Sequence, residues 1–247
     1  MQKHTFSLFL PTPPHNTTVG AQINITDAAL MQRIEKVLRV AASETVILFH
    51  EASVLQVRID RFEKKQIVGT ITQVTTAQPL QPQINLWLPL IERDAFEHAV
   101  YMATVFGVQT ITPLITHKTK RAALTTNELN RLHRVMIAAA EQSKQYILPI
   151  IQPIQTLENC LKKNTTSSIV FFDQEGLPAQ TVFAQIGNNK SESISCLFGP
   201  EGDLTEEEKV LLDGAHAVRC TLTSTTLRTE HAVALGVGML RTLCKKS

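Results

Sequence analysis

The chain has 247 residues, of which 43% are hydrophobic and 19% are charged, and its formal net charge at pH 7 is +2. This length is enough to bury a core, and no apolar run reaches the roughly 18 residues that a membrane-spanning helix needs. Proline breaks the N-terminal apolar stretch too early for a signal peptide, so we expect a cytoplasmic protein. The small net charge does not by itself indicate nucleic-acid binding, because phosphate binding depends on where the positive charges lie.

The cysteines and histidines do not indicate a metal site. The four cysteines lie far apart without a C-x-x-C pair, so we expect reduced residues that pack in the core. None of the eight histidines forms an H-x-x-x-H or H-x-x-E-H pattern. We therefore expect no metal in this protein.

Residues 1–74 predict a small β-barrel, because short runs rich in β-branched residues alternate there with polar connections. The expected strands are residues 46–50, 54–59 and 67–74. Residues 28–40 have apolar side chains at helical spacing on one face. The other face carries Arg33, Lys36 and Arg39, which we predict to bind RNA phosphates, although ordinary solvated charge is the alternative.

Residues 75–83 contain two prolines and no charge, which is typical of a connection between domains. From residue 84 to 247, strands and helices alternate, and this pattern predicts a predominantly parallel α/β sheet. The expected strands are 84–90, 108–115, 147–151, 168–172, 194–198 and 216–222. The expected helices are 92–106, one from about 126, a short one after 151, 206–214 and a C-terminal helix.

Three helices of this second part have informative ends or faces. Thr125 with Glu128, and Thr205 with Glu208, have the spacing of a capping box, which marks a helix start. In the C-terminal helix, residues 232–240 are apolar on every side, whereas a surface helix has one apolar stripe. We therefore expect this helix to be buried on all faces, either inside the domain or at a subunit interface.

The stretch LFGPEGDLTEEE, residues 197–208, carries the most informative pattern. An apolar strand leads into a turn with two glycines and then into a helix with an acidic first turn. Glycine lets a backbone approach a bound group, and a helix start offers unpaired N–H groups, although an ordinary strand-to-helix turn has similar residues. The segment LRTEHAVALGVGML, from Leu227, follows another strand, and the carboxyl ends of parallel strands are where α/β folds bind ligands.

GPEG followed by LRTE and an alanine-containing helix resembles the signature of the ribosomal RNA small-subunit methyltransferase E family. GVQTITPLIT from Gly107, AAEQS at 139–143 and RIEKVLRV in the first part are also similar to this family. The resemblance covers nearly the whole chain and is strongest over 107–151 and 197–235. The joint occurrence of these motifs in order is more specific than any one of them.

This resemblance implies a fold, an activity and partners. Members of the family have an N-terminal PUA-like β-barrel, which binds RNA, and a C-terminal SPOUT α/β domain with a trefoil knot. They form homodimers and methylate N3 of one uridine in 16S ribosomal RNA of the small subunit, using S-adenosylmethionine. For this chain we accordingly expect the barrel in 1–74, a linker in 75–83 and the methyltransferase domain in 84–247.

The resemblance also implies which residues form the site. The expected cofactor-binding residues are Leu197, Phe198, Gly199, Pro200, Gly202, Leu222 and Leu227. Arg228 stays protonated at any working pH and is expected to stabilise negative charge on the uracil, oriented by Glu230 or Glu201. The structural alternatives are a salt bridge for Arg228 and a helix-dipole role for Glu230.

Several residues depart from the family pattern. Asp203 and Thr223 stand where the family has glycine, and Thr225 stands in place of an arginine. Lys144 and Gln145 likewise replace a glycine and an arginine. A β-branched residue at positive φ is strained, so Thr223 predicts a shifted loop, weaker cofactor binding or a different substrate site.

Two other functions stay open at this point. The replacement of family arginines by Thr225 and Gln145 would suit an RNA-binding relative with weakened catalysis. A knotted enzyme acting on a ribose 2′-hydroxyl or on transfer RNA is also compatible, since a fold does not fix a substrate, although LRTE argues against it. A nicotinamide-dependent oxidoreductase is excluded, because Gly236 and Gly238 lie inside the last helix with no strand after them.

Overall fold

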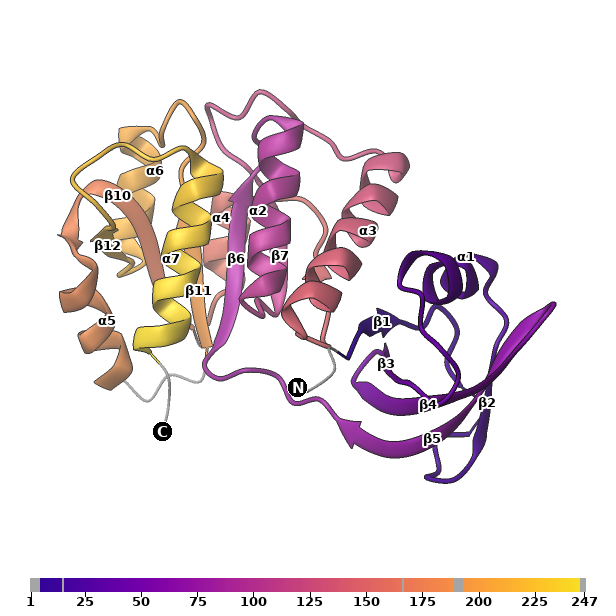
Figure 1. Ribbon diagram of the computed structural model, residues 1–247. Helices are drawn as coiled ribbons and strands as arrows, with labels where there is room; N and C mark the ends of the chain where they lie inside the picture. Colours follow the sequence, from indigo (N-terminus) through magenta and orange to yellow (C-terminus); the bar gives the residue numbers. More distant parts are fainter. Residues whose placement is uncertain (1–4, 15, 166, 189–192, 245–247) are drawn as a thin grey trace. The chain divides into compact units, whose positions relative to one another are not determined.

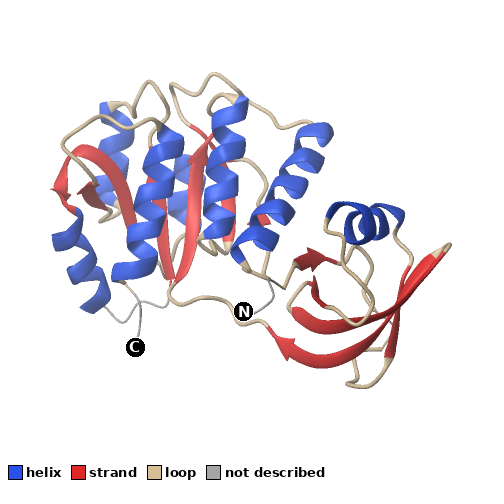
Figure 2. Cartoon of the chain, in the orientation of Figure 1, coloured by secondary structure: helices blue, strands red, loops and turns tan. Residues whose placement is uncertain are grey.

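The computed structural model describes residues 5–14, 16–165, 167–188 and 193–244. The chain divides into two compact units (Figure 1). The small unit comprises Met1–Gln78 with Ala140–Ile147, and the large unit comprises Pro79–Ala139 with Leu148–Ser247. Figure 2 shows that strands dominate the small unit, whereas helices and strands alternate in the large one.

The small unit is built on a five-stranded sheet in the order β1-β3-β4-β5-β2. Its strands are β1 (Ser7–Phe9), β2 (Gln22–Ile25), β3 (Thr45–His50), β4 (Ser53–Glu63) and β5 (Gln66–Thr76). Only the β1 to β3 pairing is parallel among the described strands of this sheet. Alternate residues of β3 and β4, including Val46, Leu48, Val57 and Ile59, are completely buried, as period-2 strands over one core require. The three strands expected here are confirmed.

A short helix interrupts the sheet of the small unit. The α-helix α1 (Ala28–Gln32) begins where the Asp27 carboxylate accepts a hydrogen bond from the Leu30 amide, and a π-helical turn (Arg33–Val37) continues it. The expected helix over 28–40 thus ends three residues early. Arg39 adopts a φ of +52°, a left-handed conformation that cannot continue a right-handed helix.

The small unit includes the end of a long helix from later in the chain. Glu141, which is 8% exposed, accepts hydrogen bonds from both terminal nitrogens of Arg33 and from the Phe9 amide. The Tyr146 ring packs on Phe49 with centroids 5.2 Å apart. Because a guanidinium and a carboxylate pair well in this two-pronged geometry, Glu141 ties residues 140–147 to the π-helical turn through Arg33, and it ties them to β1 through the Phe9 amide.

The large unit is a parallel sheet of seven strands in the order β12-β10-β11-β6-β7-β8, with β9 also paired to β7. The strands are β6 (Gln83–Pro89), β7 (Thr110–Ile115), β8 (Ile150–Ile151), β9 (Gln155–Thr156), β10 (Ser168–Pro178), β11 (Ser193–Phe198) and β12 (Val218–Thr221). All the pairings are parallel. The predicted parallel α/β sheet is therefore confirmed.

Helices cover both faces of this sheet (Figure 1). They are α2 (Arg93–Val105), α3 (Thr126–Ser143), α4 (Leu157–Lys163), α5 (Ala179–Asn188), α6 (Glu206–Gly214) and α7 (Thr229–Leu243). One core joins α2, α5 and α7 to the sheet, and a second core lies under α4 and α6. Since every strand must connect to its parallel neighbour through a crossover, the carboxyl ends of the strands share one edge.

Some details of the large unit differ from expectation. The strand expected over 147–151 is reduced to β8, and α5 was not predicted. The C-terminal helix is not buried on every face of this chain, because Leu235 is 37% exposed, so that prediction is wrong for the single chain. All four cysteines are free and buried, as expected. Among the described residues, no helix is long and apolar enough to cross a membrane.

Candidate active site

A cavity of about 760 Å³ opens beside the middle of β10 and the carboxyl ends of β11 and β12. Much of its wall is formed by residues 172–175 within β10 and by residues 198–201 and 220–223 at the ends of the other two strands, and residues 225–230 complete it. The GPEG turn and the LRTE segment therefore meet in one place. Thr229 makes the link directly, since its hydroxyl donates to the Gly199 carbonyl at 2.8 Å.

The GPEG turn is held by local hydrogen bonds at its far end. The Asp203 amide donates to the Pro200 carbonyl at 2.9 Å and closes the turn. Thr205 and Glu208 then form the predicted capping box at the start of α6. The second oxygen of Glu208 accepts from the His117 amide at 2.9 Å, so the loop after β7 is fixed to the same helix start.

One wall of the cavity is aromatic. The rings of Phe172 and Phe198 are stacked, with centroids 4.4 Å apart. Gly236 of α7 makes room for them, because a Cβ at that position would lie 2.9 Å from Phe198 and 3.0 Å from Phe172. Gly236 is therefore a packing residue beneath the cavity, and Gly238 is a packing residue against Phe106, which agrees with the exclusion of a dinucleotide-binding motif.

A buried lysine joins two of the loops that form the cavity. Lys209 Nζ lies 3.0 Å from Asp173 Oδ2 and 3.1 Å from Asp203 Oδ2. Burial opposes the charged form of Lys209, but its hydrogen bonds with the two aspartates leave its pKa above the ordinary value. Burial likewise opposes ionisation of Asp173, yet a hydrogen bond from the Glu175 amide and the Lys209 charge keep its pKa below the ordinary value. We call Asp173, Asp203 and Lys209 the lysine cluster.

The charge of the cavity favours a cation. Its acidic lining residues are Glu92, Asp173, Glu175, Glu201, Asp203 and Glu230, and its basic ones are Lys209 and Arg228. Carboxylates thus outnumber cations by six to two. A ligand with a net positive charge would be attracted into this site, and the aromatic wall offers a surface for a flat ring.

The structure brings most of the expected site residues together. Arg228, Glu230 and Glu201 all line the cavity, and so do Phe198, Gly199, Pro200, Leu222 and Leu227. Leu197 and Gly202 do not. The Leu197 side chain is completely buried in the core beneath α6, and Gly202 lies against the aliphatic part of Lys118.

The three predicted catalytic residues differ in their surroundings. Arg228 is exposed at the N-terminus of α7, and Glu230 is 8% exposed in its first turn. Glu201 is exposed, and its Oε1 accepts a long hydrogen bond of 3.3 Å from the Glu92 amide. No ion pair of Arg228 with a described residue is present, so its guanidinium is free to meet a ligand.

The departures from the family pattern have different structural outcomes. Asp203 and Lys144 adopt φ values of +60° and +58°, which are the conformations that glycine would adopt easily. Thr223 has no positive φ, so the strain predicted for it is wrong. Its hydroxyl instead bonds with the Thr225 amide and carbonyl, which makes a local turn that a glycine could not form.

Sequence reasoning missed residues in the middle of β10, which runs beyond the expected 168–172 to Pro178, and in the middle of α6. Asp173, Gln174, Glu175 and Lys209 all line the cavity. A polar segment directly after the buried run SIVFF was an available signal for the first three, because ligands gather at strand ends. Lys209 gave no such signal, since a lysine in a helix is usually exposed.

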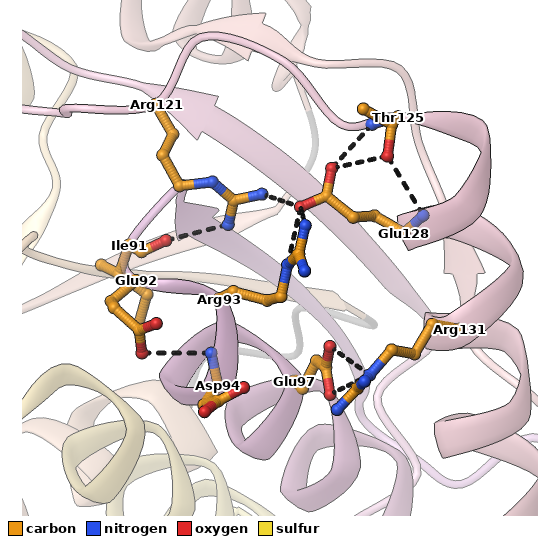
Figure 3. A network of polar contacts seen from close by, with 9 residues as sticks. All are labelled: Ile91, Glu92, Arg93, Asp94, Glu97, Arg121, Thr125, Glu128 and Arg131. Carbon is orange, nitrogen blue, oxygen red and sulfur yellow. Dashed lines mark hydrogen bonds and ion pairs between the residues drawn. The ribbon is translucent and has the colours of Figure 1, made fainter.

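A polar network supports the loop between β7 and α3 (Figure 3). Glu128 accepts hydrogen bonds from the Thr125 amide and hydroxyl, and from Arg121 and Arg93. Arg121 also donates to the Ile91 carbonyl at 3.0 Å. The network thus joins the start of α3 to the segment just before α2, next to Glu92 at the cavity.

Glu128 should make the stability of the large unit depend on acid pH. The hydrogen bonds from Thr125 and the Arg121 charge lower its pKa from 4.5 to about 2. A carboxylate with a lowered pKa in the folded state stabilises the fold above its unfolded pKa, and this contribution is lost as the pH falls from 4.5 towards 2. We expect urea unfolding at several pH values to show that Glu128→Gln flattens this acid limb, and equal slopes for both proteins would contradict the expectation.

Comparisons with known proteins agree on one family. A model of the RNA methyltransferase domain matches residues 78–241. The ribosomal RNA small subunit methyltransferase E of Rickettsia conorii is 26% identical over 227 residues, which cover 91% of each chain. The protein of the same name from Aquifex aeolicus is 24% identical and covers 83% of this chain and 88% of its own. A crystal structure of a ribosomal RNA small subunit methyltransferase E from Neisseria gonorrhoeae, bound to S-adenosyl methionine, superposes with a TM-score of 0.81 at 24% identity, over 97% and 98% of the two chains.

Proposed function

The chain belongs to the RNA methyltransferase domain family, and from this membership we propose that it methylates N3 of a uridine in 16S ribosomal RNA, in the cytoplasm, using S-adenosylmethionine. The observation that carries the proposal is the meeting of GPEG and LRTE at one acidic, partly aromatic cavity. The names of the relatives support a small-subunit ribosomal RNA as the substrate. The choice of N3 rests on the motif resemblance.

The residues present fit S-adenosylmethionine. This cofactor carries a sulfonium and an ammonium against one carboxylate, so its net positive charge suits a lining with six carboxylates and two cations. Phe172 and Phe198 offer an apolar wall to the adenine, and Leu222 and Leu227 line the same cavity. The backbone groups of Gly199 and Pro200 would approach the cofactor at the GPEG turn. When bound, the cofactor supplies an electrophilic methyl group.

Arg228 is proposed to assist the loss of the N3 proton. Uridine N3 is a weak nucleophile while it is protonated, and its negative charge after deprotonation is shared by the neighbouring carbonyl oxygens. A permanently charged guanidinium beside these oxygens lowers the energy of that anion. Glu230 and Glu201 line the same cavity and are proposed to orient Arg228 once the base is bound. The acidic lining disfavours RNA phosphates, so the base alone should enter.

We propose three further features on the strength of the family resemblance. The small unit is an RNA-binding barrel, the segment leading into α7 passes through a trefoil knot, and two copies form a homodimer. The hydrogen bond from Thr229 to Gly199 supports a close crossing of the two loops. Leu235 is exposed although it is apolar, and this supports a partner surface on α7.

Of the three residues proposed to bind RNA in the small unit, Arg33 is engaged by another side chain. Arg33 is engaged in the two-pronged pair with Glu141, whereas Lys36 reaches only the neighbouring, exposed Glu35. We expect Lys36→Ala with Arg39→Ala to weaken ribosomal RNA binding and to reduce its salt dependence by about two charges, because each phosphate contact releases counterions. Filter binding at several salt concentrations measures this slope. Arg33→Ala should in addition lower the melting temperature, and an unchanged slope in the double variant would reject the surface.

A single experiment tests the activity. Small-subunit ribosomal RNA from a strain lacking the gene is incubated with the purified protein and S-adenosylmethionine, and the nucleosides are identified by mass spectrometry. N3-methyluridine is the expected product. A methyl group on a ribose would favour the other knotted enzyme, and binding of RNA without any methylation would favour the weakened relative.

A further inference from the structure

A second cavity, of about 320 Å³, lies on the opposite side of the sheet core from the aromatic wall. Its floor is formed by neighbouring strands in register, with Ser195 beside Asn85 and Asn85 beside Thr110. Trp87 and Thr112 form the next row. This polar row crosses β11, β6 and β7, which are central strands of the sheet.

Polar side chains are unusual at such positions. Central strands of a parallel sheet are buried on both faces and are normally apolar on both. The opposite face of β6 follows this rule, since Ile84, Leu86 and Leu88 are completely buried in the main core. On the cavity side, Ser195 is 2% exposed and Thr112 is 8% exposed. Buried polar groups are costly unless something bonds to them. Ser195 donates to Asn164 Oδ1 at 2.9 Å and Asn85 pairs with Thr110, so the groups that could meet a ligand are the remaining donors of the lining.

The hydrogen bonds around the cavity use the hydroxyl protons of Thr110 and Ser195 and leave amide and ammonium donors. Asn85 Oδ1 accepts from the Thr110 hydroxyl at 2.8 Å, and Gln155 Oε1 accepts from Lys163 Nζ at 3.2 Å. The amide nitrogens of both residues and the other protons of Lys163 therefore remain available. Trp87, which is 5% exposed, adds an indole N–H that forms no hydrogen bond with a described residue.

The charge of the second cavity is opposite to that of the first. None of its described lining residues is acidic, and Lys163 is the charged residue among them. Cys160 also lines the cavity, and burial raises the pKa of its thiol to about 11, so that it stays neutral at physiological pH. The cavity thus combines one ammonium with the free amide donors of Asn85 and Gln155 and the indole N–H of Trp87.

We propose that this second cavity is a binding site for a phosphate-bearing ligand about the size of one nucleotide. Phosphate oxygens only accept hydrogen bonds, so they match a lining with one cation, several free donors and no carboxylate. The volume is at the lower end of the range for small-molecule sites, which suits a nucleoside monophosphate. The same chemistry occurs in a free nucleotide and in one phosphate of an RNA strand. The site is independent of the proposed methyl transfer.

Trp87 provides a local readout, because it is the one tryptophan in the chain. We expect its fluorescence to change with saturation when uridine monophosphate or inorganic phosphate is added, and not when uridine is added. A short oligouridine is the third probe. If uridine monophosphate binds and the oligouridine does not, the ligand is a free nucleotide. If the oligouridine binds more tightly than uridine monophosphate, the ligand is RNA.

Two variants and a matched control make the test specific. Lys163→Gln removes the cation, and Asn85→Asp places a carboxylate among the donors, so each should weaken binding of the monophosphate at least tenfold. Lys162→Gln removes a neighbouring exposed lysine outside the lining and should leave binding unchanged. The proposal is overturned if no phosphate probe gives a saturable change at millimolar concentration, or if Lys163→Gln binds as well as the wild type. Because Lys163→Gln should bind S-adenosylmethionine normally, either failure is distinguishable from failure of the proposed function.

Discussion

Replacing Arg228 by alanine should lower the rate of methyl transfer about 10²-fold to 10³-fold, which is the usual effect of removing one donor that stabilises a developing negative charge. Arg228 stands at the N-terminus of α7, lines the cavity and has no ion pair with a described residue, so its loss should disturb the fold little. Single-turnover methylation of unmodified ribosomal RNA measures the chemical step. Titration calorimetry measures the affinity for S-adenosylmethionine, which should change less than about threefold.

The contrast between these two measurements separates catalysis from binding. An interaction made only in the transition state lowers the rate and leaves ground-state binding unchanged. Arg228→Lys keeps the charge but not the planar fork, so it should recover part of the rate. Arg134→Ala, an exposed arginine of α3 outside the cavity, is the matched control. If Arg228→Ala weakens cofactor binding as much as it slows methylation, the electrophilic role is wrong.

The fold of the large unit was predictable because its signals are local. Apolar runs of strand length, capping residues and alternation of elements all act within a few residues of one another. The strand expected over 147–151 failed for a non-local reason, since residues 140–147 belong to the small unit, where Tyr146 packs on Phe49 and Glu141 bonds to the Phe9 amide. The helix α5 was missed because it has no acidic residue in its first turn and no basic residue in its last turn, and it contains Gly187.

The site was predictable in part for a related reason. A turn after a strand can be identified from the sequence, and GPEG and LRTE were found in this way. The error at Thr223 came from assigning it the φ of the glycine that it replaces, whereas its hydroxyl builds a different turn. Asp203 does adopt a positive φ, and the sequence did not indicate that its carboxylate would cluster with Lys209 and Asp173. Such clusters depend on tertiary structure.

The lysine cluster should be essential to both stability and cofactor binding. Lys209→Met removes the cation that neutralises Asp173 and Asp203, and the side chain of Asp173 is only 5% exposed. Leaving a buried carboxylate without its partner costs about 3–5 kcal/mol. We therefore expect urea unfolding to show a loss of that size. We also expect weaker binding of S-adenosylmethionine by calorimetry, because Lys209 connects Asp173 of β10 to Asp203, which follows the GPEG turn.

The double variant Asp173→Asn with Lys209→Met is the decisive control. It removes the buried negative charge together with its partner, so it should recover a large part of the lost stability. Recovery of stability without recovery of cofactor affinity would assign the cluster a positioning role at the GPEG turn. Lys209→Arg, which keeps the charge, should retain both properties better than methionine does. A Lys209→Met protein that unfolds at the urea concentration of the wild type would contradict this account, because a buried aspartate cannot lose the cation 3.0 Å from it at no cost.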